Sequence, residues 1–171
     1  LAIPMFGEFV APVASRSYIR RRGIRHPAHL ARVELLHDAS MRRVGRPHGW
    51  AEWFRMAKVT GVDTGPGMRF DDGHVVLQAA AAGRGAALGR LAYAIDDLHD
   101  RRLKIPFAPV IDMDLKYYLL IPQSRATEPA IAALRAWIEQ EAGLFAPRLQ
   151  AVVEAGRALS AAKKATAGRR A

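Results

Sequence analysis

The chain has 171 residues, half of them hydrophobic, which is enough to bury the core of one domain or of two small lobes. It contains no cysteine, so disulfide bonds and thiolate zinc sites are excluded. No apolar run reaches the length of a membrane helix, and the opening residues lack the pattern of a signal peptide. We therefore expect a cytoplasmic protein without membrane contact.

The net charge of +10 is distributed unevenly along the chain. Residues 16–58 contain 11 Lys and Arg against 3 acids, residues 157–171 contain 5 against none, and the rest of the chain is slightly acidic. The arginines at 20–22 could contact phosphate groups, although an arginine-rich face exposed to solvent is the commoner reason for such a cluster. Charge alone therefore leaves both interpretations open.

The first third of the chain predicts short elements separated by turn residues. Ser15 is suited to cap a helix, Gly23 to end one, and Pro27 to occupy a first helical position. Trp50 and Trp53 recur at helical spacing, which favours a core stripe over a ligand cage. The expected elements, in order, are a strand over 8–13, helical segments over 17–22 and from 27, a strand over 33–37, and a helix over 49–57.

The middle of the chain predicts alternating helices and strands. A helix is expected over 70–82, because Asp71 and Asp72 suit a helix N-terminus and Gly83 suits its end. This alternation is typical of an α/β fold. The elements that follow are a strand over 86–89, a helix over 91–98 and a strand over 103–107.

The last third predicts one strand and one helix. Residues 115–121 form an apolar run that Pro122 closes, and residues 128–142 carry an apolar helical stripe. From residue 146 the sequence is rich in Ala, Lys and Arg, so residues 146–171 are expected to form a basic C-terminal tail with a frayed end.

Patterns for catalysis and cofactor binding are absent from the sequence. His26 and His29 flank Pro27, which disfavours a shared helix face, so we expect no metal site. Neighbouring acids such as Asp96 and Asp97 diverge on a helix and cannot converge on one bond. Residues 78–92 could imitate a helix-turn-helix, but their second half offers almost no side chain to base edges. We therefore expect neither an enzyme, nor a cofactor, nor a DNA-reading element.

Several segments together resemble the effector-binding domain of LysR-type transcription regulators, and most closely the subgroup of glycine-cleavage activators. The resemblance covers about residues 7–142 and is distinctive because its parts occur in order. The segments are PVASRSYIRRRGIRHPAHLARVELLHD, WAEWFRMAKVTG, MRFDDGHVVLQAAAAGRGAALG, DDLHDRRLKIPF, and YYLLIP followed by IAALRAWIEQEA.

The resemblance implies a fold of the type 2 periplasmic-binding-protein kind, in which two α/β lobes are joined by two crossover strands around a ligand cleft. The sequence would then be a partial effector domain over 1–145: crossover strands at 8–13 and 115–121, the second lobe over 15–115, and a helix at 128–142 returning to the first lobe. We expect the start of the first lobe, the helix-turn-helix and its linker helix to lie outside these residues.

The resemblance and the helix physics place the effector at the same point. The first turn of the helix predicted at 70–82 offers free backbone N–H groups, which favour an anion such as the carboxylate of an amino acid. The tyrosines at the second crossover match positions that reach the ligand in the family, although ordinary strand packing explains them equally well. The candidate effector-binding residues are Ser15, Asp72, Gly73, His74, Tyr117 and Tyr118.

These observations predict a small-molecule effector-sensing and oligomerising module of a transcription regulator. DNA would be bound only through a helix-turn-helix outside this sequence, and a homo-oligomer is expected. The alternative is a stand-alone small-molecule binding protein of the periplasmic type. A basic nucleic-acid binder ranks third.

Overall fold

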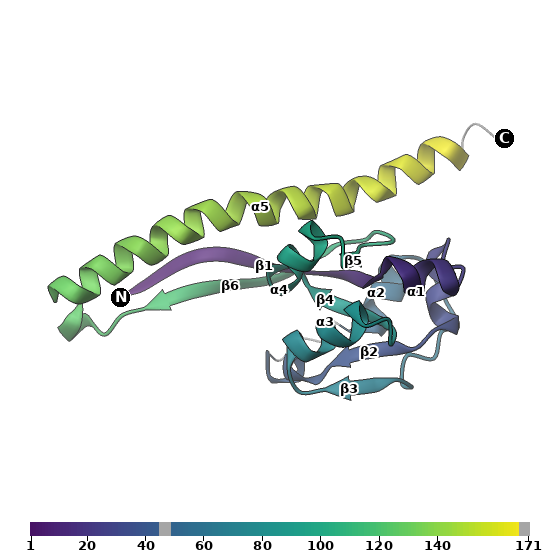
Figure 1. Cartoon of the computed structure of the whole chain (residues 1–171), viewed down its shortest axis with the longest axis horizontal. Coiled ribbons are helices and arrows are strands. Elements are labelled where there is room, and N and C mark those ends of the chain that lie inside the picture. Colours follow the sequence, from purple (N-terminus) through teal and green to yellow (C-terminus); the bar gives the residue numbers. More distant parts are fainter. Residues whose placement is uncertain (45–48, 168–171) are drawn as a thin grey trace.

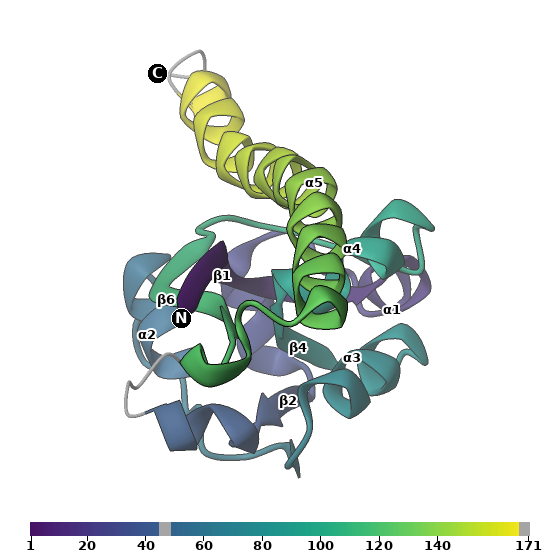
Figure 2. The same ribbon diagram turned by 90° about the vertical axis from the view of Figure 1, so that its left-hand side faces the viewer.

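The protein is described here by a computed structural model, which covers residues 1–44 and 49–167. Its centre is a six-stranded sheet in the order β3-β2-β4-β1-β5, with β6 pairing to β1 outside this path. Helices lie on both sides of the sheet, with α2 on one side and α3 and α4 on the other (Figure 2). The strands are β1 (Ala2–Ser15), β2 (Leu35–Asp38), β3 (Met68–Phe70), β4 (Ala86–Arg90), β5 (Leu103–Lys104) and β6 (Ile111–Leu120). The α-helices are α1 (Arg16–Arg21), α2 (Trp50–Met56), α3 (Gly73–Ala81), α4 (Leu91–His99) and α5 (Pro129–Ala167), and 3-10 turns occupy Pro27–Arg32, Ala39–Val44 and Gln123–Arg125.

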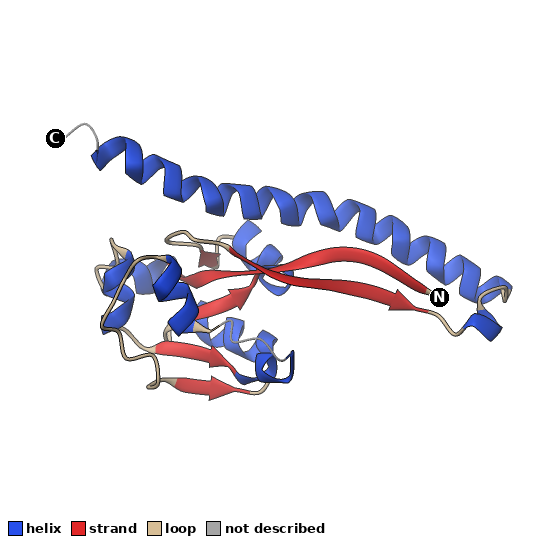
Figure 3. Cartoon of the chain, turned by 180° about the vertical axis from the view of Figure 1, so that it is seen from behind, coloured by secondary structure: helices blue, strands red, loops and turns tan. Residues whose placement is uncertain are grey.

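Strand β1 joins two parts of the molecule. Its first half pairs antiparallel with β6, from Ala2 opposite Leu120 to Val10 opposite Ile111. Its second half pairs antiparallel with β4 and then with β5 inside the lobe. The paired β1 and β6 therefore project from the lobe as a two-stranded ribbon, with α5 running alongside (Figures 1 and 3).

The parallel strands β2, β3 and β4 give the lobe its α/β character, as the sequence predicted. β2 pairs parallel with both β3 and β4. Because α3 follows β3 and α4 follows β4, both helices begin near the same edge of the sheet, where the carboxyl ends of the parallel strands meet. This edge is where open α/β sheets usually bind ligands.

The aromatic stripe of α2 is part of the core. Trp50, Trp53 and Phe54 are buried and pack against one another with ring centroids 5.3–5.8 Å apart. The indole N–H of Trp53 donates to the carbonyl of Pro109 at 2.9 Å, and that of Trp50 to the carbonyl of Leu36 at 3.1 Å. The prediction of a core stripe is confirmed.

The C-terminal helix is much longer than the sequence predicted. It runs from Pro129 to Ala167 without the break expected after residue 142, so the prediction of a tail beginning at residue 146 is wrong for the described part. Buried Leu149 and Val153 face the lobe, and Gly156 allows a close approach because a Cβ there would lie 2.6 Å from a Val110 methyl carbon. The spacing of 149, 153 and 156 is a helical stripe that the Ala- and Lys-rich composition obscures. Helix α5 and the other described helices are not apolar enough to cross a membrane.

Two smaller predictions differ from the structure, and a third is confirmed. Phe70 ends strand β3, so the helix predicted from residue 70 begins only at Gly73, behind Asp72 as its N-cap. The strand predicted over 103–107 shortens to the two residues of β5. Residues 86–90 form strand β4, which confirms that the glycine-rich stretch is not a helix-turn-helix.

Candidate functional site

The carboxyl edge of the parallel strands carries two charged residues. Asp38 is the last residue of β2 and Arg90 the last residue of β4, the parallel neighbour of β2. α3 begins three residues after β3 ends, and α4 begins directly after Arg90. Both charges therefore lie at the edge where the segments that follow β2, β3 and β4 begin.

Arg90 belongs to a tight polar group that also contains a buried carboxylate. Arg90 Nε donates to Glu8 Oε2 at 2.7 Å, and the Tyr117 hydroxyl donates to the same oxygen at 2.5 Å. Arg90 Nη2 donates to the Tyr117 hydroxyl oxygen at 2.5 Å. Glu8 is only 1% exposed. Because Glu8 comes from β1, Tyr117 from β6 and Arg90 from β4, this group, the Glu8 cluster, holds the ribbon to the lobe.

The electrostatics of the Glu8 cluster follow from its burial and its pairing. Burial raises the pKa of the Tyr117 hydroxyl well above its ordinary value, and the hydrogen bond to Glu8 raises it further. Burial lowers the pKa of Arg90, but the hydrogen bond and negative charge of Glu8 outweigh this effect and leave that pKa raised. Tyr117 is therefore neutral and Arg90 charged over the physiological range.

Aromatic rings extend the site from Arg90 to the start of α3. The guanidinium of Arg90 lies 4.2 Å from the centroid of the Tyr93 ring, and the His74 ring stacks on Tyr93 at 4.2 Å with an interplanar angle of 8°. Gly73 is buried beside them, and a Cβ there would lie 2.9 Å from Asp38 Oδ2 and 3.2 Å from a Tyr93 ring carbon. A side chain at this position would have to push the Asp38 carboxylate aside, so glycine permits the close approach that brings Asp38 next to the aromatic pair.

Asp38 has one carboxylate oxygen without a partner. Its Oδ1 accepts hydrogen bonds from the backbone N–H and the hydroxyl of Ser40. Its Oδ2 is buried and has no hydrogen-bond partner among the described residues. A buried carboxylate oxygen is costly to leave unpaired, so this atom is suited to a donor group brought by a ligand.

Asp72 changes the expected chemistry of the helix start. Its side chain accepts hydrogen bonds from the backbone N–H groups of His74, at 2.7 Å, and of Val75, at 3.3 Å. These were the groups expected to receive the anionic end of a ligand. Asp72 is thus the N-cap of α3, and an anion must displace it or bind elsewhere in the site.

The six residues predicted from the sequence divide into two sets. Gly73, His74 and Tyr117 lie in one continuous chain of contacts with Arg90, and Asp72 adjoins it.

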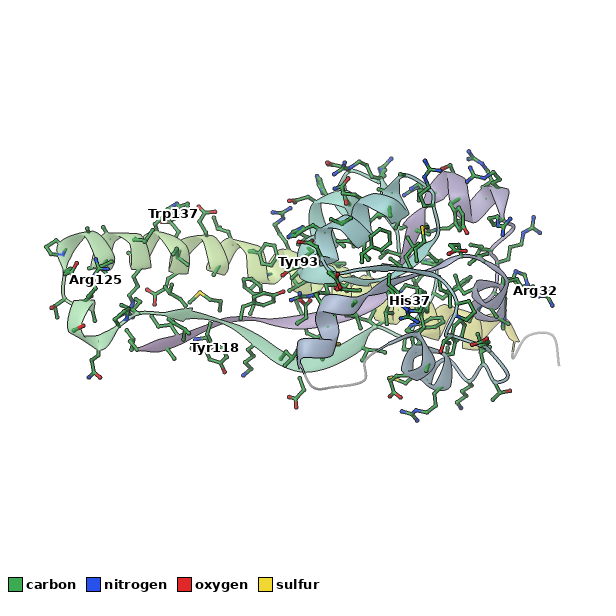
Figure 4. The ribbon with its side chains drawn as sticks, turned by 90° about the horizontal axis from the view of Figure 1, so that it is seen from below. Arg32, His37, Tyr93, Tyr118, Arg125 and Trp137 are labelled. Carbon is green, nitrogen blue, oxygen red and sulfur yellow. The ribbon has the colours of Figure 1, made fainter. Side chains whose placement is uncertain are left out.

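The other two predicted residues lie elsewhere. Ser15 caps α1 by accepting a hydrogen bond from the Tyr18 N–H, and its hydroxyl is near Gly83, beyond the opposite end of α3. Tyr118 is 52% exposed and lies farther out along β6 than the junction at which Tyr93 is found (Figure 4).

Sequence reasoning missed Glu8, Asp38, Arg90 and Tyr93. Glu8 carried a signal, because a single acid at the start of a strand of otherwise apolar residues is expensive to bury and needs a partner. Asp38, Arg90 and Tyr93 carried none, since each becomes significant only through the strand order. Among the described residues there is no group of three His, Asp or Glu side chains that could hold a metal ion.

A lobe of mixed α/β structure, a two-stranded ribbon and a polar site at the carboxyl edge of parallel strands define a ligand-binding fold of the periplasmic-binding-protein type. The chain belongs to the LysR substrate-binding domain family, whose model matches residues 1–143. The resemblance noted in the sequence is therefore confirmed.

Curated relatives and solved structures agree with this assignment. The chain is 32% identical over 135 residues to the glycine cleavage system transcriptional activator of Escherichia coli K12, covering 78% of the chain and 42% of that protein. It is 31% identical over 136 residues to the HTH-type transcriptional regulator TrpI of Pseudomonas aeruginosa, covering 78% of the chain and 44% of that protein. The chain thus spans less than half the length of these relatives.

Two effector domains of solved structure share the fold. The effector domain of the transcriptional regulator AmpR of Pseudomonas aeruginosa has a TM-score of 0.65 and 25% identity, over 85% of this chain and 67% of that one. The AmpR effector-binding domain of Citrobacter freundii has a TM-score of 0.64 and 25% identity, over 84% and 68% respectively.

Proposed function

We propose that the chain is the effector-sensing and oligomerising module of a LysR-type transcription regulator that acts in the cytoplasm and is not an enzyme. The family membership and the names of the relatives, which are transcriptional regulators, support this proposal. The stand-alone binding protein is not favoured, because the two relatives described above are transcriptional regulators. DNA reading belongs to a helix-turn-helix outside these residues, and the coding sequence upstream of Leu1 tests this directly. A secretion signal there in place of an in-frame helix-turn-helix would contradict it.

The effector site that we propose lies at the carboxyl edge, between Asp38, the start of α3 and the Glu8 cluster. The single observation that carries it is the buried, unpartnered Asp38 Oδ2, which lies against Gly73. Tyr117 is neutral, and the charge of Arg90 is already paired with Glu8, so neither residue offers the site an unpaired charge. The ligand's own donor is therefore the strongest new interaction available there.

The chemistry of the site favours a small metabolite with an ammonium or amide donor. Such a donor would pair with Asp38 Oδ2, which the fold leaves without one. His74, which is exposed, and the guanidinium of Arg90 lie beyond Gly73 and can donate to the other end of the ligand. An amino acid or a related carboxylate meets both requirements.

The Glu8 cluster supplies a route from this site to the rest of the molecule. A ligand that contacts Arg90 or Tyr93 touches residues bonded to Glu8 of β1 and Tyr117 of β6. Those strands form the ribbon that leaves the lobe. A ligand that changes the contacts between Arg90 and Glu8 would therefore change the position of the ribbon relative to the lobe. A ligand can drive such a change only if it binds one of the two positions more tightly than the other.

The test is calorimetric titration of the protein with the common amino acids and with matched simple carboxylates and amines. We expect an amino acid to bind and the matched carboxylate without its ammonium group to bind at least about tenfold more weakly, as loss of a charged hydrogen bond predicts. Asp38→Asn, His74→Ala and Tyr117→Phe should each weaken binding. Ser15→Ala and Tyr118→Phe are matched controls and should leave it unchanged. Affinity that is unchanged in all three site variants refutes the site.

Oligomerisation is tested separately by sedimentation velocity. Exposed Tyr118, Leu120 and Trp137 on the ribbon and α5 provide apolar surface for association. We expect a concentration-dependent oligomer at tens of micromolar protein, and a monomer under the same conditions contradicts this part of the proposal.

A further inference from the structure

Two adjoining hollows at the far end of the lobe share the same two arginines. One, of about 750 Å³, is lined by Tyr18, Glu34, Met68, Phe70 and Ala79 together with Arg21, Arg22 and Arg84. The other, of about 440 Å³, is lined by Arg21, Arg22, Arg32 and His29 together with Gly23 and Val33. We call the surface formed by Arg21, Arg22, Arg32, Arg84 and His29 the basic face.

The positive charge of the basic face is not neutralised by carboxylates. Its four arginines are exposed, and none forms a salt bridge with any residue in the described part of the chain. Glu34 is the one acid that lines either hollow. This differs from Arg55, Arg90 and Arg125, each of which pairs with a glutamate.

The backbone presents these arginines from three separate segments. Arg21 and Arg22 lie at the end of α1, Arg32 at the end of a 3-10 turn, and Arg84 in the turn between α3 and β4. Arg21 is positioned by a hydrogen bond from Nη2 to the Gly83 carbonyl at 3.4 Å and lies 5.6 Å from the Tyr18 ring. In Figure 1, α1 lies at the opposite end of the molecule from the N-terminus, and Figure 4 shows Arg32 at that end. The basic face is therefore separate from the effector site.

We propose that the basic face contacts the phosphate backbone of duplex DNA without reading its sequence. Charges spread over two adjoining hollows match a polyanion with regularly spaced phosphates better than they match one small anion. The elements there are a six-residue helix, a 3-10 turn and a loop, so none can lie in the major groove as a recognition helix. Contacts of this kind fix the position of a protein on the duplex but carry no sequence information.

A membrane surface fits the same face less well. Interfacial binding needs apolar side chains that insert beside the charges. Of the large hydrophobic side chains exposed in the described residues, Met68 alone lines either hollow. Binding to anionic lipid is therefore the competing outcome of the test.

The experiment measures fluorescence anisotropy of a labelled duplex of arbitrary sequence, titrated with the protein at salt concentrations from about 50 to 200 mM. We expect equal affinities for unrelated sequences and a slope of log K against log salt of roughly −0.9 for each phosphate contacted. Arg21→Gln/Arg22→Gln/Arg84→Gln should weaken binding roughly tenfold or more at the lowest salt and flatten the slope. Arg22→Gln/Arg32→Gln, which removes the arginine of the 3-10 turn in place of Arg21 and Arg84, should have a smaller effect in the same direction.

The matched control removes the same charge elsewhere. Lys58→Gln/Lys104→Gln/Lys116→Gln alters three exposed lysines outside the basic face and should retain nearly full affinity. Equal losses in the arginine and lysine variants would mean that only net charge matters, which overturns the proposal. The proposal is also overturned if, of all these variants, only Lys163→Gln/Lys164→Gln, near the C-terminus, loses affinity for the duplex. It is overturned as well if the protein binds vesicles of anionic lipid more tightly than the duplex at equal salt.

Discussion

Arg90 at the end of β4 and Glu8 in β1 are joined by a salt bridge of 2.7 Å in which the glutamate is 1% exposed and the arginine 18% exposed. This pair connects the lobe to the ribbon. Removing one member leaves the other buried without its counter-charge, which is the costliest way to break such a pair.

We therefore expect Arg90→Leu to lower the free energy of unfolding by about 3–5 kcal/mol. Adding Glu8→Gln to that variant should restore part of the loss, because the uncompensated charge is removed. Urea denaturation of the single and double variants measures both values. A double variant less stable than Arg90→Leu contradicts this account of the pair.

Tyr117 makes stability depend on alkaline pH. Its pKa is raised in the folded protein by burial and by the bond to Glu8, so its contribution is fully present below the ordinary tyrosine pKa of about 10 and is lost as the pH rises above that value. Tyr117→Phe should lose less stability than the unmodified protein between about pH 9 and 11. Tyr118→Phe, at an exposed position of the same strand, should lose as much as the unmodified protein. The measurement is the free energy of unfolding of the unmodified protein and of both variants at several pH values across this range.

The N-cap of α3 can be tested with two neighbouring aspartates. Asp72→Ala removes the acceptor of two backbone N–H groups and should cost about 1 kcal/mol of stability. Asp71→Ala removes an equal charge one residue earlier, where no capping bond is made, and should cost much less. Equal losses in chemical denaturation would show that charge near the helix start, and not the cap, is responsible.

The second half of α5 should contribute to the stability of the lobe. Leu149→Ala, at a position 2% exposed, is expected to cost about 2–5 kcal/mol. Leu144→Ala, at a position 62% exposed on the same helix, should change stability by less than about 0.5 kcal/mol. If thermal or urea unfolding shows no difference between these two variants, residues beyond 145 behave as the tail that the sequence suggested.

The sequence by itself determined the α/β class, the core stripe of α2 and the presence, but not the first residue, of the helix that borders the site. Each depends on contacts within a few residues: Trp50, Trp53 and Phe54 repeat at helical spacing, and Asp72 precedes a run without breakers. Glycine and proline positions also mark the ends of several short elements, such as α1 before Gly23 and α3 before Gly83, because they act through local backbone geometry. The full length of α5 could not be predicted from local patterns. Only its packing against the lobe distinguishes the apolar stripe that contains Leu149 and Val153 from a polar tail.

The tertiary structure alone decided which polar residues meet. Arg90 lies 82 residues after Glu8 in the chain, and Tyr117 lies 109 residues after it. Only the pairing of β1 with both β4 and β6 brings the three together. The same pairing leaves Tyr118 exposed beside the half-buried Tyr117, because successive side chains of a strand point to opposite faces. Ser15, the last residue of β1, is the N-cap of α1. It lies near Gly83, at the end of α3 opposite the site. Hydrophobic periodicity specifies faces, whereas register and strand order, which depend on long-range contacts, specify the site.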